Sequence, residues 1–251
     1  MAILHVLVLP LVMALAWGWT AMRLTQGSDP GGLLVLLGGV LLVYGGDRLR
    51  DPAPVLAALW LRAAWQRRLL VGLTGLGPPV VLLGLWWSWW PALVTLGCAA
   101  LLVGLWLPAR RLPGAAELVV ASAWALVCAC LPTGLPPWVA VQALGPWIVL
   151  QLLLFTAGTI LCGLKDRVHD RARGHRSLAD LDDGGAAQRV AMALALSAGM
   201  LAWQLPFRGP VSVAGALLLL AQFPTVLRRP LLGPILVDTA LCLVLVDPPS
   251  P

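Results

Sequence analysis

The chain has 251 residues, of which 60% are apolar and 11% charged, and its mean hydropathy is +0.89. Soluble globular domains contain about 25% charged residues, so this composition excludes a soluble enzyme or binding domain and indicates an integral membrane protein. The net charge of +6 comes from 17 basic and 11 acidic residues. Since charged side chains are costly in lipid, most of them are expected at the ends of membrane spans.

Nine segments are apolar enough to cross the hydrocarbon core as helices, which takes roughly 20 residues each. In chain order they cover about 2–22, 31–47, 69–87, 89–107, 115–132, 138–163, 189–206, 211–226 and 231–246. The first segment is predicted to be a retained span, because no basic residue precedes it and no small-residue cleavage site follows it. The prolines at Gly77-Pro78-Pro79 and Pro224 predict either a kink or a helix end. The predicted fold class is all-α, a polytopic membrane helix bundle of about nine transmembrane helices that forms a single domain over residues 1–251.

The basic residues are distributed unevenly among the connections between these segments. Arg23 and Arg208 fall on one side of the membrane, and fifteen others follow the even-numbered segments and share the opposite side. Those fifteen are Arg48, Arg50, Arg62, Arg67, Arg68, Arg110, Arg111, Lys165, Arg167, Arg171, Arg173, Arg176, Arg189, Arg228 and Arg229. The positive-inside rule places that side in the cytoplasm, with the N-terminus inside and the C-terminus outside. The basic excess is therefore explained by topology, no nucleic-acid partner is implied, and a bacterial inner membrane is the expected location.

Tryptophan and cysteine give two further indications. Eight tryptophans map to the predicted outer ends of spans, as in an aromatic belt: Trp17, Trp19, Trp86, Trp87, Trp89, Trp90, Trp138 and Trp203. The run of four at 86–90 is interpreted as an interfacial anchor rather than a cofactor stack. All five cysteines lie inside apolar segments, which argues against a disulfide framework or a cysteine metal site.

Two short acidic motifs stand out among the eleven carboxylates. Asp47 and Asp51 follow the second apolar segment, and Asp166 and Asp170 follow the sixth. A spacing of four residues places both members of a pair on one helix face. Mg²⁺ is typically bound by one or two carboxylates together with substrate phosphates. Two such pairs on the same side of the membrane predict metal-mediated diphosphate binding. One pair alone would be a weak signal, because mixed acidic and basic residues are common at cytoplasmic helix ends.

A basic pair and the residues after the second motif extend the pattern. Arg110 and Arg111 lie between the fourth and fifth segments, and the second motif continues to Gly174, Ser177 and Leu178. In these features the chain resembles the UbiA superfamily of intramembrane prenyltransferases. That family is similar in having nine helices, an Asn/Asp-x-x-x-Asp motif after the second, a basic pair before the fifth, and an Asp-x-x-x-Asp with Gly-x-x-Ser/Thr-Leu after the sixth.

The resemblance implies an activity and a role for each site residue. It implies transfer of a prenyl group from a polyprenyl diphosphate to an aromatic or lipid acceptor, with Mg²⁺ as cofactor and the four aspartates as metal ligands. The loops at about 48–68 and 164–188 would cap the site. The residues that would contact the substrate are Arg110, Arg111, Lys165, Arg167, Arg171 and Tyr44.

The first motif is shorter than the family pattern. It begins with Asp47 rather than the common Asn, no third acid follows, and the next loop lacks an Arg-Pro element. Two alternatives therefore stay open: a terpene cyclase of the same fold, and a non-catalytic membrane scaffold or lipid-binding protein.

Several other polar residues each have two possible roles, and the sequence does not distinguish between them. Glu117 is expected either to pair with Arg110 or Arg111 or to favour the positive end of its helix. Asp238, near the middle of the last segment, is expected to be a protonated acid bonded to a neighbour such as Thr239, or else a functional residue. Three polar residues of the sixth segment are expected either to line an acceptor pocket or to join helices: Gln151, Thr156 and Thr159.

Overall fold

The computed structural model describes residues 7–50, 64–109, 112–164, 177–205, 208–229 and 232–246. Within these ranges all regular secondary structure is helical, which confirms the predicted all-α class. The elements are α1 (Leu9–Thr25), α2 (Pro30–Arg50), α4 (Ala64–Trp87), α5 (Trp89–Ala109), α6 (Ala115–Cys130), α7 (Pro137–Gly163), η2 (Leu178–Gly184), α9 (Gly185–Ala202), α10 (Gly209–Ala221), α11 (Pro224–Leu227), α12 (Leu232–Cys242) and η3 (Leu243–Val246).

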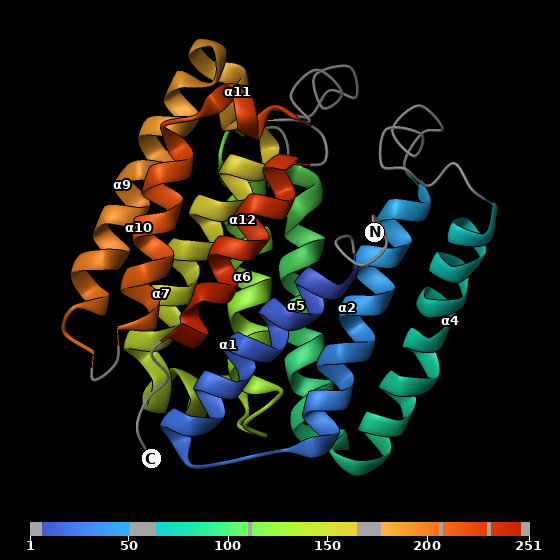
Figure 1. Cartoon of the computed structure of the whole chain (residues 1–251). Coiled ribbons are helices and arrows are strands. Elements are labelled where there is room, and N and C mark those ends of the chain that lie inside the picture. Colours follow the sequence, from blue (N-terminus) through green and yellow to red (C-terminus); the bar gives the residue numbers. More distant parts are fainter. Residues whose placement is uncertain are drawn as a thin grey trace.

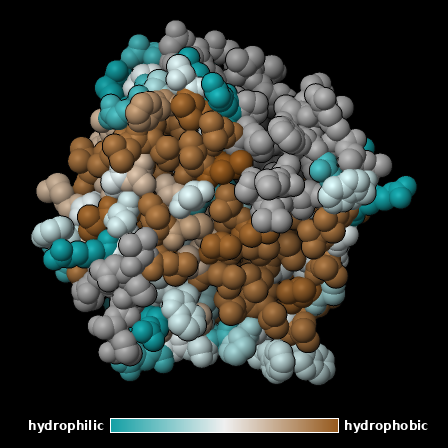
Figure 2. Space-filling model, viewed as in Figure 1, coloured by the Kyte–Doolittle hydropathy of each residue, from teal (hydrophilic) through white to brown (hydrophobic). Residues whose placement is uncertain are grey.

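Five of these helices are long and apolar enough to cross a membrane: α2, α4, α6, α7 and α9. Helices α5, α10 and α12 contain shorter apolar stretches, and α1 has 17 residues. The lengths and apolar surfaces of these helices show the character of an integral membrane protein. Figure 2 agrees, since hydrophobic residues cover the middle of the visible face and hydrophilic residues lie mainly toward its edges.

The sequence predicted either a kink or a helix end at two proline sites, and the structure differs between them. Helix α4 continues through Pro78 and Pro79 without a break. Near Pro224 the chain does break, because α10 ends at Ala221 and the short α11 begins at Pro224. A kink that the sequence analysis did not predict lies in α7, where Leu144 leaves helical geometry just before Pro146, whose ring removes a backbone donor.

The helices run up and down in chain order, and the bundle closes on itself (Figure 1). Helix α1 packs against both α2 and α12, so the first and last helices are neighbours. The sequential pairs α5–α6, α6–α7, α7–α9 and α9–α10 also pack together. Helix α4 lies outside this ring, where it packs on α2 and on α5. It therefore presents most of its surface outward.

Small residues allow α2 and α4 to approach each other closely. Gly31 and Gly38 of α2 lie against Gly84 and Gly77 of α4, and each glycine of this group is so near the facing helix that a Cβ would clash with it. The glycines on each helix are seven residues apart, close to two helical turns, so they form one stripe. Close backbone approach through small residues is a common way for helices to associate in lipid.

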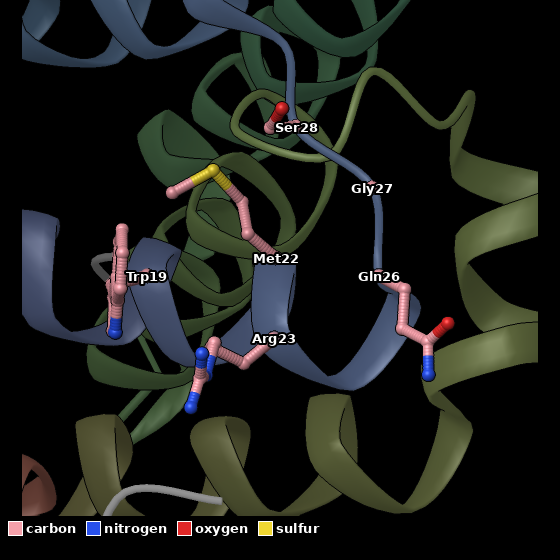
Figure 3. A pocket seen from close by; sticks show the side chains of 6 residues that line it. All are labelled: Trp19, Met22, Arg23, Gln26, Gly27 and Ser28. Carbon is pink, nitrogen blue, oxygen red and sulfur yellow. The ribbon is translucent and has the colours of Figure 1, made fainter. Parts of the chain in front are cut away.

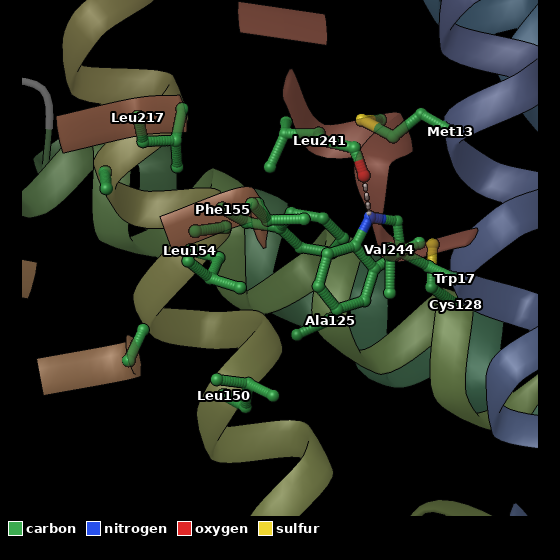
Figure 4. Close-up of a cluster of buried hydrophobic side chains, with 14 of the residues drawn as sticks. Met13, Trp17, Ala125, Cys128, Leu150, Leu154, Phe155, Leu217, Leu241 and Val244 are labelled. Atoms are coloured by element: carbon green, nitrogen blue, oxygen red, sulfur yellow. Dashed lines mark hydrogen bonds between the residues drawn. The ribbon is translucent and has the colours of Figure 1, made fainter. Parts of the chain in front are cut away.

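Trp17 is a core residue, so its assignment to the aromatic belt is wrong. Its side chain is 0% exposed and packs against Trp147 in a tilted arrangement and against Phe155 edge to face, each with a ring-centroid distance of 5.0 Å. Its indole N–H donates to the Leu241 carbonyl oxygen over 3.0 Å (Figure 4). Met13, on the same helix, belongs to the same core cluster. Trp17 thus ties α1 to α7 and to the end of α12.

The other seven tryptophans of the predicted belt are all exposed: Trp19, Trp86, Trp87, Trp89, Trp90, Trp138 and Trp203. They lie at the end of α1, in the turn from α4 to α5, at the start of α7 and just after α9, which Figure 1 shows at one end of the bundle. Exposed aromatic rings at one level are typical of a membrane interface.

Asp29 organises this tryptophan-rich end, and the sequence analysis did not single it out. Its carboxylate accepts a hydrogen bond from the Gly32 N–H over 3.1 Å and another from the Ser88 hydroxyl. Its backbone N–H donates to the Pro132 carbonyl oxygen over 2.8 Å. One residue thereby caps α2 and connects it to the α4–α5 turn and to the segment after α6.

Candidate functional site

The first acidic motif lies at the end of α2. The helix extends to Arg50, so Asp47 lies in its last turn with an exposed side chain, and Asp51 lies just outside the described residues. Tyr44 comes one turn earlier and its ring is 5.6 Å from that of Trp124 on α6. Tyr44 therefore contacts α6, and α2 ends at the end of the bundle opposite the exposed tryptophans (Figure 1).

The remaining predicted site residues lie outside the described ranges: Asp166, Asp170, Arg110, Arg111, Lys165, Arg167 and Arg171. The described helices nevertheless lead to them. Helix α7 ends at Gly163 and α5 at Ala109. Figure 1 shows both of these ends at the same end of the bundle as the end of α2. Both motifs therefore follow helices that end on one face.

The predicted capping loops are shorter than expected. The segment 48–68 was expected to be a loop, but α2 continues to Arg50 and α4 already begins at Ala64. The segment 164–188 was also expected to be a loop, yet η2 and the first turn of α9 occupy its second half. Helical structure extends past the apolar runs because polar residues are compatible with a helix once it leaves the lipid.

Glu117 holds in place the segment that follows the second motif. It lies in the first turn of α6, is only 7% exposed, and its carboxylate accepts the backbone N–H of Leu178 over 3.2 Å. The Leu178 side chain packs over Gly114, which has φ +83° and precedes α6. The Asp180 carboxylate accepts the Ser177 N–H over 3.1 Å and so caps η2. The Ser177-Leu178 continuation of the second motif is therefore fixed against the start of α6.

An apolar cavity of about 270 Å³ lies between α2, α5 and α6. Its wall contains only aliphatic residues, glycine and Trp124: Val35, Leu36, Gly39, Val40, Val43, Leu96, Ala99, Val103, Val120, Ala123, Trp124, Val127 and Leu131. Val43 lies one turn before Asp47, and Trp124 is the residue that contacts Tyr44. The cavity thus extends into the bundle from the helix end that carries the first motif.

A larger depression, of about 410 Å³, lies at the opposite end of the bundle beside the end of α1. Trp19, Met22, Arg23, Gln26, Gly27 and Ser28 line it (Figure 3). Its described lining contains one guanidinium and no carboxylate, so it does not offer the ligands of a divalent cation. The acidic motif and this depression are separate features.

Other polar residues in the bundle have structural roles. Gln151 is 0% exposed, and with its amide oriented to suit its neighbours it donates to the Ala125 carbonyl oxygen over 3.1 Å and accepts from Trp147 Nε1 over 3.3 Å. Thr156 and Thr159 donate to carbonyl oxygens of their own helix. None of these three lines the cavity. Gln151 therefore joins α7 to α6, and the two threonines satisfy backbone carbonyls of their own helix.

Asp238 lies on α12 with a partly buried side chain. The Thr239 hydroxyl donates to the Ile235 carbonyl oxygen over 2.7 Å. Its oxygen can still accept from a protonated acid, so a bond between Asp238 and Thr239 stays a prediction. Asp238 is distant in sequence from both motifs and does not line the apolar cavity.

Whether a hard divalent cation can bind depends on the carboxylates at the end of the bundle where α2 ends with the first acidic motif. Asp47 offers exposed oxygen ligands there, of the kind that Mg²⁺ prefers. Among the described residues no group of three or more His, Cys, Asp or Glu side chains is close enough to hold a metal, but Asp51, Asp166 and Asp170 are not among those residues.

The architecture defines the chain as a helical integral membrane protein with an apolar cavity next to an acidic helix end. No family model, curated protein or solved structure matches the chain.

Proposed function

We propose that this protein is a Mg²⁺-dependent intramembrane prenyltransferase with a UbiA-like bundle of nine transmembrane helices. Its donor is a polyprenyl diphosphate and its acceptor is an aromatic or lipid molecule. The observation that supports this proposal best is the apolar cavity between α2, α5 and α6, which begins one turn from Asp47. A polyprenyl diphosphate matches this arrangement, because its charged diphosphate would lie at the acidic helix end and its apolar chain in the cavity.

In the proposed reaction the bond between the allylic carbon and the diphosphate oxygen breaks, and the diphosphate leaves with the electron pair. The acceptor then donates an electron pair to the allylic carbon and releases a proton. Mg²⁺ supplies charge neutralisation for the leaving diphosphate. Asp47 and Asp51 would hold one Mg²⁺ and Asp166 and Asp170 a second, and Arg110 and Arg111 would bind diphosphate oxygens.

Further residues of the motif loops complete the proposed site. Lys165, Arg167 and Arg171 add positive charge around the diphosphate. Tyr44 and Trp124 lie at the boundary between the acidic helix end and the cavity. Their ring faces stabilise positive charge on the allylic carbon and exclude water from it.

The proposed orientation places the motif end in the cytoplasm of a bacterial cell, with the protein in the inner membrane. The described part of this end carries five exposed arginines: Arg67, Arg68, Arg189, Arg228 and Arg229. The opposite end has Arg23 and Arg208 together with the exposed tryptophans. This asymmetry follows the positive-inside rule.

Turnover by the purified protein in lipid vesicles tests the proposal. With an allylic diphosphate and a mixture of aromatic and lipid acceptors, we expect Mg²⁺-dependent release of diphosphate and a prenylated product. Asp166→Ala and Asp170→Ala are each expected to reduce turnover by about a hundredfold or more, since even the loss of a residue that only supports a metal ligand costs about 10–100-fold. Asp182→Asn is the matched control, since Asp182 is an exposed acid near the same end whose ion pair with Arg189 is at the surface. Normal turnover in both motif variants would contradict the proposal.

A second candidate function is binding of a membrane lipid without catalysis. The cavity supports it directly, because a wholly apolar wall binds a lipid chain whether or not the acids act. Simultaneous alanine replacement of all four motif aspartates distinguishes the two functions. Under the lipid-binding alternative, cellular function survives this replacement. A terpene cyclase would instead form a hydrocarbon product that needs no acceptor.

A further inference from the structure

We infer that the cavity between α2, α5 and α6 receives the isoprenoid chain of the donor and limits it to a short chain, with Gly39 as the residue that sets this limit. This inference rests on the proposed function and adds to it the length class of the substrate.

The dimensions of the cavity favour a short chain. Along α2 its wall extends from Val35 to Val43, and eight residues at a rise of 1.5 Å correspond to about 12 Å. This is less than half of a hydrocarbon core about 30 Å thick. The volume of about 270 Å³ is also at or below the low end of ligand pockets, which span roughly 300–1,000 Å³. A long polyprenyl chain therefore does not fit inside the cavity.

Side-chain burial identifies an open end and a closed end. Val43, next to the motif end, is 62% exposed. Val35, Leu36 and Leu131, at the other end, are each 1–2% exposed and belong to the packed core. A chain that enters near Asp47 is therefore stopped by the side chains at the far end.

Gly39 lies halfway along this path, between the open and closed ends. A Cβ built on Gly39 would have no heavy atom within 4 Å, so a side chain there would occupy the cavity rather than clash with a helix. Gly39 differs in this from Gly38, whose Cβ would meet the backbone of α4. The absence of a side chain at Gly39 leaves room for a ligand.

The charges around the open end argue for a diphosphate as the head group. Fifteen of the 17 basic residues in the sequence lie in the predicted connections on this side of the membrane or in the helix turns next to them, and so do the paired aspartates. Cations and metal-binding carboxylates together suit a diphosphate. An uncharged lipid would not use these groups, so a diphosphate-linked chain is the occupant that fits both ends.

The test compares Gly39→Leu with Gly75→Leu. Gly75 is also a helical glycine with no heavy atom within 4 Å of a built Cβ, but it lies on α4 and does not line the cavity. Turnover is measured with geranyl, farnesyl and geranylgeranyl diphosphate. The native protein and Gly75→Leu are expected to use geranyl and farnesyl diphosphate in preference to geranylgeranyl diphosphate. In Gly39→Leu the ratio of farnesyl to geranyl turnover should fall about tenfold, since one or two excluded carbons change discrimination by this amount. An unchanged ratio would overturn the inference while the proposed function stands.

A second measurement does not depend on catalysis. Farnesyl diphosphate with a photoreactive group on its chain is irradiated with each protein, and the labelled peptides are identified. Labelling on α2, α5 and α6 that is lost in Gly39→Leu and kept in Gly75→Leu supports the inference, even if no turnover is found and the proposed function fails. Labelling on other helices, or labelling that Gly39→Leu does not reduce, contradicts it.

Discussion

Trp17 and Trp19 show why a single side chain is difficult to assign from the sequence of a membrane helix. Both lie near the end of the same apolar run, and both were predicted to lie at the interface. Trp17 is buried among α1, α7 and α12, whereas Trp19 is 51% exposed. In an all-apolar helix the hydrophobic pattern does not distinguish the face toward protein from the face toward lipid, so the partner helices decide which tryptophan is buried.

The hydrogen bond of Trp17 gives a prediction at this scale. Trp17→Phe removes the indole N–H and leaves the Leu241 carbonyl oxygen without this donor. Because an intramolecular hydrogen bond contributes about 0.5–1.5 kcal/mol, we expect the free energy of unfolding in detergent to fall by at least this amount. Trp19→Phe, at an exposed position, should change it by less than about 0.5 kcal/mol. Equal effects of the two substitutions would refute the core assignment.

Glu117 gives a second prediction, this time about order near the site. Glu117→Ala removes the acceptor of the Leu178 N–H, so the segment 177–184 should lose its attachment to α6. Hydrogen exchange at Leu178 is expected to accelerate at least about tenfold, which corresponds to about 1.4 kcal/mol. Glu117→Gln keeps an acceptor oxygen and should retain most of the protection. Unchanged exchange in Glu117→Ala would show that η2 is held in place by other contacts.

At the scale of whole elements, the apolar runs predicted where the helices lie, because a helix in lipid must satisfy its own backbone groups. Each of the nine predicted segments coincides with a helix or a pair of short helices in the described ranges. The sequence analysis did not determine that α4 continues through Pro78 and Pro79 while α10 ends before Pro224. Neighbouring helices decide whether a proline-containing turn stays helical in a bundle, and a single sequence does not contain that information.

The association of α4 with α2 yields a prediction for this scale. Gly84→Ala places a Cβ 2.5 Å from the Gly31 carbonyl oxygen, so the helices must separate. Overpacking of this kind typically costs about 1–3 kcal/mol. Gly72→Ala is the control, since a Cβ at Gly72 has no heavy atom within 4 Å and alanine favours the helix by about 1 kcal/mol. In detergent, the midpoint temperature of thermal unfolding should be equal or higher for Gly72→Ala than for the native protein, and clearly lower for Gly84→Ala. The reverse order would exclude a close α2–α4 contact.

At the scale of the whole molecule, the charge asymmetry and the tryptophans predict how the bundle is oriented. In a variant that lacks the five native cysteines, Ser28→Cys should react with a membrane-impermeant thiol reagent added to intact cells. Arg228→Cys should react only after the cells are opened. Both positions are exposed in the structure, at opposite ends of the bundle. The opposite labelling pattern would invert the proposed topology and place the acidic motifs outside the cytoplasm.

The candidate site was less predictable from the sequence than the fold. The position of the first motif after an apolar run predicted that Asp47 lies at a helix end, and the structure confirms this. The lining of the cavity was not predicted, because its wall combines residues from α2, α5 and α6 that are far apart in the chain and resemble every other apolar residue. Asp29 was also missed, since its partners Ser88 and Pro132 come close only after the helices assemble.

The central claim is that both acidic pairs bind one metal–diphosphate unit, and binding of Mn²⁺ measures this without knowledge of the acceptor. Mn²⁺ prefers the same oxygen ligands as Mg²⁺, and electron paramagnetic resonance detects its bound fraction in the purified protein. We predict that inorganic diphosphate strengthens Mn²⁺ binding, and that Asp47→Asn and Asp170→Asn each abolish this strengthening, whereas Asp182→Asn preserves it. Mn²⁺ binding that does not respond to diphosphate, or that persists unchanged in both motif variants, would contradict the account.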